Sequence, residues 1–362
     1  MQKKYLWSLT ILIVGLIITG QIYFSTSFST QPIGEIITQP KDSLINKTED
    51  NYQNKDELHQ QTFKVRILNG RHKGKIYSIK NDYAPSQVVT QKYYFYQRVI
   101  VGFVKGKAKV VSPKRDWVFF FALTIVVSLM LAIMDKSAKM LILSLLLNAI
   151  IFYYVVKLDI AANGTNVLWI YSIASIIFTF LSLILGQGLS KKMLVTFVAT
   201  LLGVFIAFGL SYAIMRLTNE SGIKYEAVEY ATQDPRTIFL AQSLLGVLGA
   251  VMDEATDIVS SLYNLSRHKP DLNFRELIKS GRTLGQEIMG PLINVLVLIF
   301  MAEALPMAIL YLRDNNTLKY TFEFALSLGI IQSLISAIGI VLTVVFATLC
   351  STVFLKEKRQ KL

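Results

Sequence analysis

Acidic and amide side chains inside two neighbouring apolar stretches are the residues of this sequence best suited to chemistry. Three acids lie within five positions of the stretch 239–264, and a Glu and an Asn lie seven positions apart in the stretch 286–312. Seven residues are about two helical turns, so this pair shares one helix face. Carboxylate and amide oxygens suit hard cations, and intramembrane carboxylates also relay protons. We therefore predict a cation or proton site that consists of Asp253, Glu254, Asp257, Ser260, Glu287 and Asn294.

A helix over 239–264 has two unlike faces. One face carries small and oxygen-bearing residues, and the opposite face carries large apolar residues such as Leu244 and Ile258. Glu254 is expected on the shoulder of the polar face. The residues expected to allow close helix packing or to break a helix are Gly246, Gly249, Gly290 and Pro291.

Three further features of these two stretches lead to predictions. Gly281 and Gly285 form a G-x-x-x-G pattern, which is typical of close helix packing. Glu303 lies near the outer end of its stretch, just before Pro306, and we expect it at the membrane interface rather than in the site. The acids of 239–264 have two alternative interpretations, namely structural pairing and plain solvation at the inner end of the span.

Composition excludes several classes of protein. The 362 residues are 53% hydrophobic and only 17% charged, which leaves too few charges for a water-exposed surface. A soluble enzyme and a soluble nucleic-acid binder are therefore excluded. The three histidines lie outside the apolar stretches, and neither H-E-x-x-H nor a P-loop pattern occurs, so a zinc protease and an ATPase are disfavoured. The lone Cys350 is expected to be a packed core residue, and a bound hard cation is the one cofactor that we consider.

Eight apolar stretches approach the roughly 20 residues needed to cross a bilayer. The fold class expected is an α-helical integral membrane protein with about eight transmembrane helices and a small extracytoplasmic β-barrel-like domain after the first helix. We expect a first helix at 1–24, a flexible tether at 25–61, the β domain at 62–115 and a seven-helix membrane domain at 116–362. The uninterrupted apolar part of 239–264 ends at Met252, so a re-entrant segment is an alternative there.

The β domain is predicted from alternating residues such as Phe63, Val65 and Ile67, followed by the turn pair Asn69-Gly70. Its basic residues are expected to form a solvated face, and no nucleic-acid partner is expected. The expected partners are the lipid bilayer and either a homologous membrane subunit or further copies of the chain.

Lys and Arg counts predict the orientation. With a cytoplasmic N-terminus, the inner connections and termini hold fifteen Lys and Arg residues and the short outer connections hold six. Both termini are then cytoplasmic and residues 25–115 are extracytoplasmic, in a bacterial cell membrane.

The stretch from Gly246 to Tyr263, followed by the segment Gly285-Gln-Glu-Ile-Met-Gly290 and by Asn294, resembles the YibE/F family of bacterial multi-pass membrane proteins. The resemblance runs from about residue 62 to the end of the chain. It implies an outer β domain followed by a membrane domain, and it singles out Asp253 and Asn294. Gln286 and Glu287 stand where an Arg-Asp pair is common in the family, and Pro291 replaces a small polar residue.

These observations favour a membrane permease or permease subunit that handles protons or hard cations through the carboxylates of the sixth and seventh spans. The alternative is a non-transporting scaffold whose outer β domain binds an envelope partner. An intramembrane enzyme is the weakest interpretation, because no nucleophile and base can be paired.

Overall fold

The computed structural model describes residues 2–26, 31–49, 55–87, 89–104, 106–227 and 234–359. The chain divides into two compact units, Met1–Ala138 and Lys139–Leu362.

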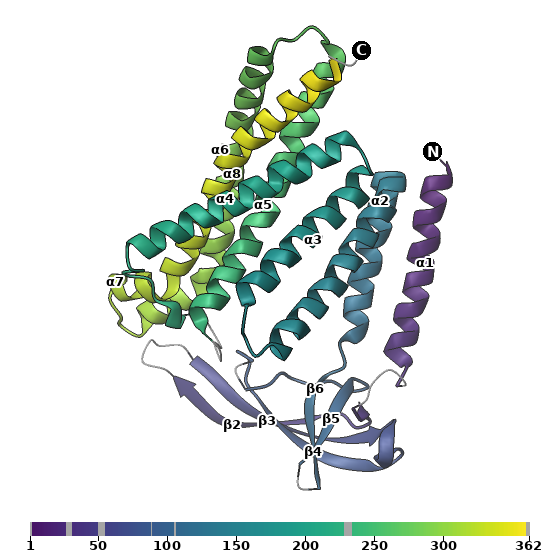
Figure 1. Ribbon diagram of the computed structural model, residues 1–362. Helices are drawn as coiled ribbons and strands as arrows, with labels where there is room; N and C mark the ends of the chain where they lie inside the picture. The colour runs from purple at the N-terminus through teal and green to yellow at the C-terminus, as the bar shows by residue number, and fades with distance from the viewer. Residues whose placement is uncertain are drawn as a thin grey trace. The chain divides into compact units, whose positions relative to one another are not determined.

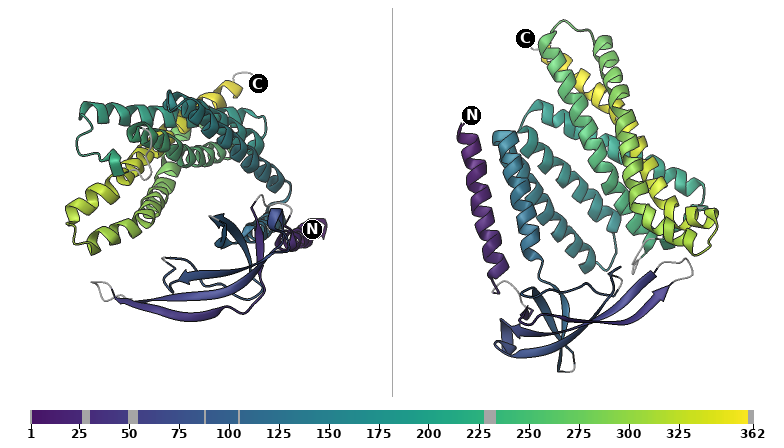
Figure 2. Two further views of the ribbon diagram at one scale, coloured as in Figure 1. Left: turned by 90° about the horizontal axis from the view of Figure 1, so that it is seen from below. Right: turned by 180° about the vertical axis from the view of Figure 1, so that it is seen from behind.

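The first unit contains helix α1 (Gln2–Phe24) and the beginning of helix α2 (Asp116–Ala161), which lie side by side (Figure 1, Figure 2). Small and hydroxyl residues form their contact. The hydroxyl of Ser8 donates to the carbonyl oxygen of Ser128 at 2.8 Å, and a Cβ on Gly15 would lie 2.2 Å from the Thr124 side chain. Lipid tails are as apolar as large aliphatic side chains, so burying such side chains gives little reason for two helices to associate. Close approach of the backbones and hydrogen bonds between hydroxyl groups join these helices instead.

Between the two helices the chain forms one antiparallel sheet. Its strands are β1 (Ile33–Ile36), β2 (Lys41–Glu49), β3 (Lys55–Ile67), β4 (Ile76–Tyr83), β5 (Arg98–Val104) and β6 (Lys107–Pro113). The order is β2-β3-β1-β5-β6, and β4 also pairs with β3. Inward side chains such as Phe63, Val65 and Val99 make its core. The prediction of a small β domain after the first helix is confirmed, but among the described residues no ladder joins β4 to β6, so closure into a barrel is not.

The sheet begins earlier than the sequence predicted. We expected residues 25–61 to be a flexible tether, but β1, β2 and the first half of β3 lie there. Every residue of β2 is exposed, so the β2–β3 hairpin lacks the one-sided apolar alternation that predicts a strand. Polar bonds stabilise it instead: His59 Nδ1 lies 3.2 Å from Asp42, its Nε2 lies 3.2 Å from Glu57, and Tyr83 donates to Asp42 at 2.6 Å.

Two basic residues, Arg98 of β5 and Lys114 directly after β6, bind the C-terminal end of α1. Arg98 donates to the carbonyl oxygen of Tyr23 at 2.9 Å, and the buried Lys114 donates to that of Ile22 and pairs with Asp116 at 3.1 Å. Cations at this end satisfy free carbonyls and complement the helix dipole. The sheet is thereby fixed to both flanking helices of its own unit.

The second unit is helical. After the end of α2 come α3 (Val167–Gln187), α4 (Lys191–Leu217), α5 (Pro235–His268), α6 (Phe274–Arg313), the short α7 (Leu318–Thr321), one π-helical turn η3 (Phe322–Leu326) and α8 (Ser327–Arg359). Across both units the described residues include eight helical stretches long and apolar enough to span a membrane, the number that the sequence predicted. The chain thus has the make-up of a multi-pass membrane protein.

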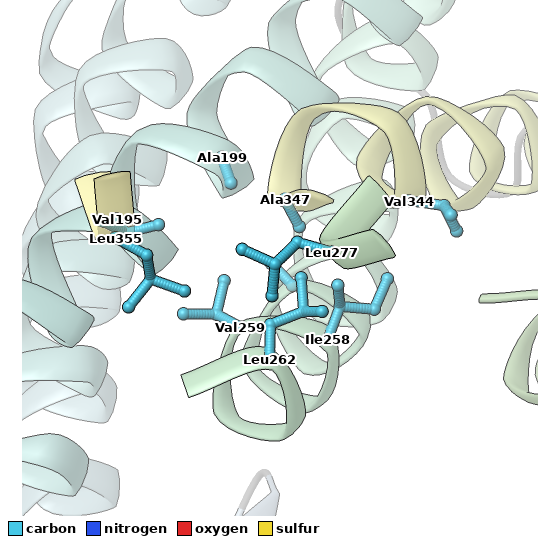
Figure 3. Packing of buried hydrophobic residues seen from close by; sticks show 10 residues of the cluster. Val195, Ala199, Ile258, Val259, Leu262, Leu277, Val344, Ala347 and Leu355 are labelled. Carbon is cyan, nitrogen blue, oxygen red and sulfur yellow. The ribbon is translucent and has the colours of Figure 1, made fainter. Parts of the chain in front are cut away.

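Helices α4, α5, α6 and α8 share the core of the second unit. Val195 of α4, Ile258 and Leu262 of α5, Leu277 of α6 and Ala347 of α8 meet in one buried cluster (Figure 3). Two glycines allow the helices to approach. A Cβ on Gly203 of α4 would lie 2.2 Å from Thr343, and one on Gly339 of α8 would lie 2.8 Å from Val247.

Candidate functional site

Helix α5 is continuous over 34 residues, about 50 Å, so it does not turn back within a membrane. Its apolar face is wholly buried in the helical unit. The buried residues of this face are Leu244, Leu248, Val251, Ala255, Ile258 and Leu262. The predicted division into two faces is therefore present, and the large apolar side chains face neighbouring helices.

The opposite face of α5 is the accessible one and carries the predicted site. Asp253, Asp257, Gly246 and Gly249 are exposed, and Ser260 is half-buried. The structure describes α5 in full, and no large apolar side chain of this helix is exposed. By contrast, α6 exposes Leu298 at 64%. We call the row Gln242, Gly246, Gly249, Asp253, Asp257, Ser260 and Asn264 the polar stripe of α5.

Glu254 differs from its acidic neighbours. The sequence placed it on the shoulder of the polar face, but it is 1% exposed and lies with Ala250 and Val251 on the buried side. Neither carboxylate oxygen has a hydrogen-bond partner among the described residues. A buried carboxylate without a partner is costly when charged. Glu254 is consequently the member of the predicted site best suited to hold a proton.

On α6 the predicted residues Glu287 and Asn294 are both exposed, as are Gly290 and Pro291. Pro291 does not break the helix, because α6 continues to Arg313. That prediction was wrong; a single proline removes one backbone bond, and the rest of the helix ladder persists.

The glycines have two different roles. Gly281 and Gly285 do pack closely, since a Cβ would lie 2.4 Å from Thr348 and 2.3 Å from Val344 of α8. At Gly249 and Gly290 a Cβ would meet no atom within 4 Å from other parts of the described chain, so these two do not serve close packing against the described helices. Gly246 is intermediate, because a Cβ would lie 2.6 Å from the amide nitrogen of Gln332.

The predicted carboxylates do not gather into one cluster in the part of the chain that the structure describes. In the described part of the chain no three His, Cys, Asp or Glu residues gather closely enough to hold a metal ion. The structure brings Glu287 near the end of the polar stripe in a pocket of about 600 Å³ between α5 and α6. This Glu287 pocket is also lined by Ser261, Asn264 and His268. Asp253, Asp257 and Asn294 do not line it.

A second pocket lies between the opposite ends of the same two helices and the start of α8. It has a volume of about 660 Å³ and includes Gln242 of α5, Glu303 of α6 and Gln332 of α8. We call it the Glu303 pocket. Sequence reasoning assigned Glu303 to the membrane interface and missed the pocket, because its lining comes from four separate segments. The only local signal was a carboxylate inside an apolar stretch.

An ion pair joins the first turn of α5 to the turn that follows α4. Arg236 Nε lies 2.8 Å from both carboxylate oxygens of Glu220. The hydrogen bond from Arg236 holds the pKa of Glu220 below its usual value, although partial burial acts against it. Burial, with the nearby Glu220 charge, raises the pKa of Tyr225 to about 12.

Comparison with known families gives two matches. The model described as YibE/F-like protein matches residues 122–357, and the model described as YibE/F family N-terminal domain matches residues 27–113. The second match includes the strands β1 and β2. Neither a curated protein nor a solved structure matches the chain.

Proposed function

Since the chain belongs to the YibE/F family, whose two domain models match residues 27–113 and 122–357, we propose that it is a membrane permease or permease subunit that conducts protons or hard cations along the exposed face of α5. The observation that carries the proposal is the polar stripe of α5. A helix long enough to span a membrane exposes two carboxylates and no large apolar side chain. An intramembrane charge of this kind faces a water-filled cavity or other protein rather than lipid.

The two pockets support a path along this face. The Glu287 pocket lies where α5 ends and α6 begins, and the Glu303 pocket lies where α5 begins and α6 ends. The polar stripe runs from one pocket to the other on α5, because its Gln242 lines the Glu303 pocket and its Asn264 lines the Glu287 pocket. Gly249 leaves open space beside Asp253. Oxygen-bearing side chains spaced along the stripe would pass a hard cation or a proton from one to the next, and no fixed metal centre is needed.

The orientation stays part of the proposal. We place both termini in the cytoplasm and residues 25–115 outside the cell membrane. In the second unit Lys191, Lys192 and Arg267 lie at the ends of α4 and α5 that this orientation makes cytoplasmic, in line with the retention of positive charge there.

The test is ion flux into proteoliposomes that contain the purified protein, measured for protons, sodium, potassium and divalent cations. Asp253→Asn, Asp257→Asn and Glu254→Gln preserve side-chain size and should each lower flux at least tenfold. Asp314→Asn is the matched control, because Asp314 is exposed at the end of α6 and outside both pockets. Melting temperatures of all variants should stay close to that of the parent.

Unchanged flux in the three variants would contradict the proposal. So would parent liposomes that conduct no faster than empty ones for every ion.

A second candidate function has one observation in its favour. Just before β5 the first unit presents three consecutive aromatic residues, Tyr94, Phe95 and Tyr96, of which the least exposed is 43% accessible. Aromatic residues are enriched where proteins dock. If the chain is a scaffold that binds an envelope partner, Tyr94→Ser with Tyr96→Ser should abolish its cellular function, and liposome flux should be absent in the parent.

A further inference from the structure

We propose that the Glu303 pocket binds a small organic cation, of the ammonium class, through carboxylates and aromatic rings. The pocket is formed by α5, α6, the π-helical turn η3 and the start of α8, with the short turn Tyr225–Ala227 at its rim. The proposal does not depend on ion conduction by the polar stripe, since it concerns binding alone.

The size and position of the pocket suit a small ligand. Its volume of about 660 Å³ is within the range of about 300–1,000 Å³ typical of ligand sites. One wall is a π-helical turn, Phe322–Leu326, and such turns occur frequently at functional sites. Gly329 shapes the same wall, because a Cβ there would overlap the ring of Phe300.

Charge in the lining favours a cation. Two carboxylates, Glu226 and Glu303, line the pocket, and no Lys or Arg does among its described lining residues. The amides of Gln242 and Gln332 supply carbonyl oxygens that can orient a polar group. An acyl chain of a lipid would offer Gln242, Glu303 and Gln332 no polar partner, which is unfavourable.

The aromatic residues distinguish an organic cation from a metal ion. Phe239, Phe300, Tyr311 and Phe324 all line the pocket. A hydrated metal ion gains little from such rings, whereas an alkylammonium group binds their faces directly. The chain itself provides an example, because Lys224 Nζ lies 5.7 Å from the centre of the Phe324 ring.

Lys224 also predicts a graded response. It lies beside the pocket, pairs with Glu226 only at 4.0 Å, and is not among the lining residues. Its positive charge should oppose an incoming cation. Lys224→Gln should therefore tighten binding severalfold, the reverse of the effect expected for loss of a carboxylate.

The experiment compares choline with 3,3-dimethyl-1-butanol, its uncharged isostere, on the full-length protein in a non-ionic detergent. Thermal stability is followed against ligand concentration, because a ligand that binds the folded state raises the melting temperature. We expect choline to give a saturable rise and the isostere to give none. Glu303→Gln should weaken choline binding at least tenfold.

Glu323→Gln is the matched control, since Glu323 lies on η3 outside the pocket and pairs with Lys319 at 3.9 Å. It should bind choline as the parent does. Asp253→Asn should also keep the choline response, so failure of the conduction proposal and failure of this one give different results.

Several outcomes would overturn the proposal. An equal rise with the uncharged isostere would mean a purely apolar pocket, and no rise in the parent would mean no ammonium site. Undiminished choline binding by Glu303→Gln would place the cation elsewhere. The comparison of choline with its isostere uses the parent protein alone, so it holds even if a variant fails to fold.

Discussion

Burial and pairing divide the acidic residues of the second unit into groups with different energetic roles. Asp253 and Asp257 are exposed, whereas Glu254 is buried with no hydrogen-bond partner in the part of the chain that the structure describes. Glu220 is instead held by Arg236, with side-chain exposures of 18% and 27%. Glu220 should therefore contribute to the stability of the fold, whereas Asp253, Glu254 and Asp257 are expected to bind cations or protons.

The first prediction concerns Glu220. Glu220→Gln removes the charge that Arg236 binds and should destabilise the protein by about 1–3 kcal/mol at pH 7. Because the pKa of Glu220 is lowered in the folded state, its stabilising effect is complete above the ordinary pKa of 4.5 and is lost as pH falls through the lower folded value. The difference in melting temperature between parent and variant should therefore shrink below about pH 4.5.

Glu226→Gln is the control for this series, because Glu226 is 61% exposed and lies 4.0 Å from Lys224. Its melting temperature should match the parent at every pH. A Glu220→Gln difference that stays constant down to pH 3 would show that the ion pair is not its origin.

At the scale of the helices, α6 carries two glycines with opposite surroundings. Gly285→Ala places a methyl group 2.3 Å from Val344 and should cost about 1–3 kcal/mol through overpacking against α8. Gly290→Ala meets no atom within 4 Å beyond its chain neighbours, so it should cost clearly less than Gly285→Ala: the helix preference of alanine, about 0.5–1 kcal/mol, is offset by the crowding that Pro291 imposes on a Cβ of the preceding residue. Thermal unfolding of the purified variants measures both effects.

These two variants control for each other, since both make the same chemical change in one helix. A similar loss of stability in both would mean that Gly290 is also packed, by lipid or by another copy of the chain. A lower ion flux through the Gly290→Ala variant would then show that ions pass through the open space near Glu287.

The helices could be predicted from the sequence because each apolar stretch has the length of a membrane span. The hairpin of β2 and β3 could not, because both its faces are polar and its bonds, such as that between His59 and Asp42, join residues 17 apart. Strand prediction depends on one buried face, and this hairpin has none.

The candidate site was predictable only in part. Helical periodicity separated the polar stripe of α5 from its apolar face, but hydropathy cannot tell a lipid-facing side chain from one in a helical core. The burial of Glu254 depends on which helices surround α5, so it required the structure. The Glu303 pocket depends on packing among α5, α6 and α8, which no single stretch of sequence reports.

At the scale of the whole chain, the membrane arrangement is a prediction from charge that labelling can test. Cys350 is the chain's one cysteine, so Cys350→Ala gives a background without thiols. Single cysteines are then introduced by Lys47→Cys in the sheet, Lys269→Cys between α5 and α6, and Asp314→Cys after α6.

On intact cells, a membrane-impermeant maleimide should label the Lys47→Cys and Asp314→Cys variants. It should label the Lys269→Cys variant only after the membrane is opened, because the basic residues around that loop favour the cytoplasm. Since α6 joins residues 269 and 314, labelling of both from one side would mean that α6 does not span. If only Lys269→Cys is labelled from outside, the orientation is the reverse of the one proposed. The Cys350→Ala background should stay unlabelled in every case.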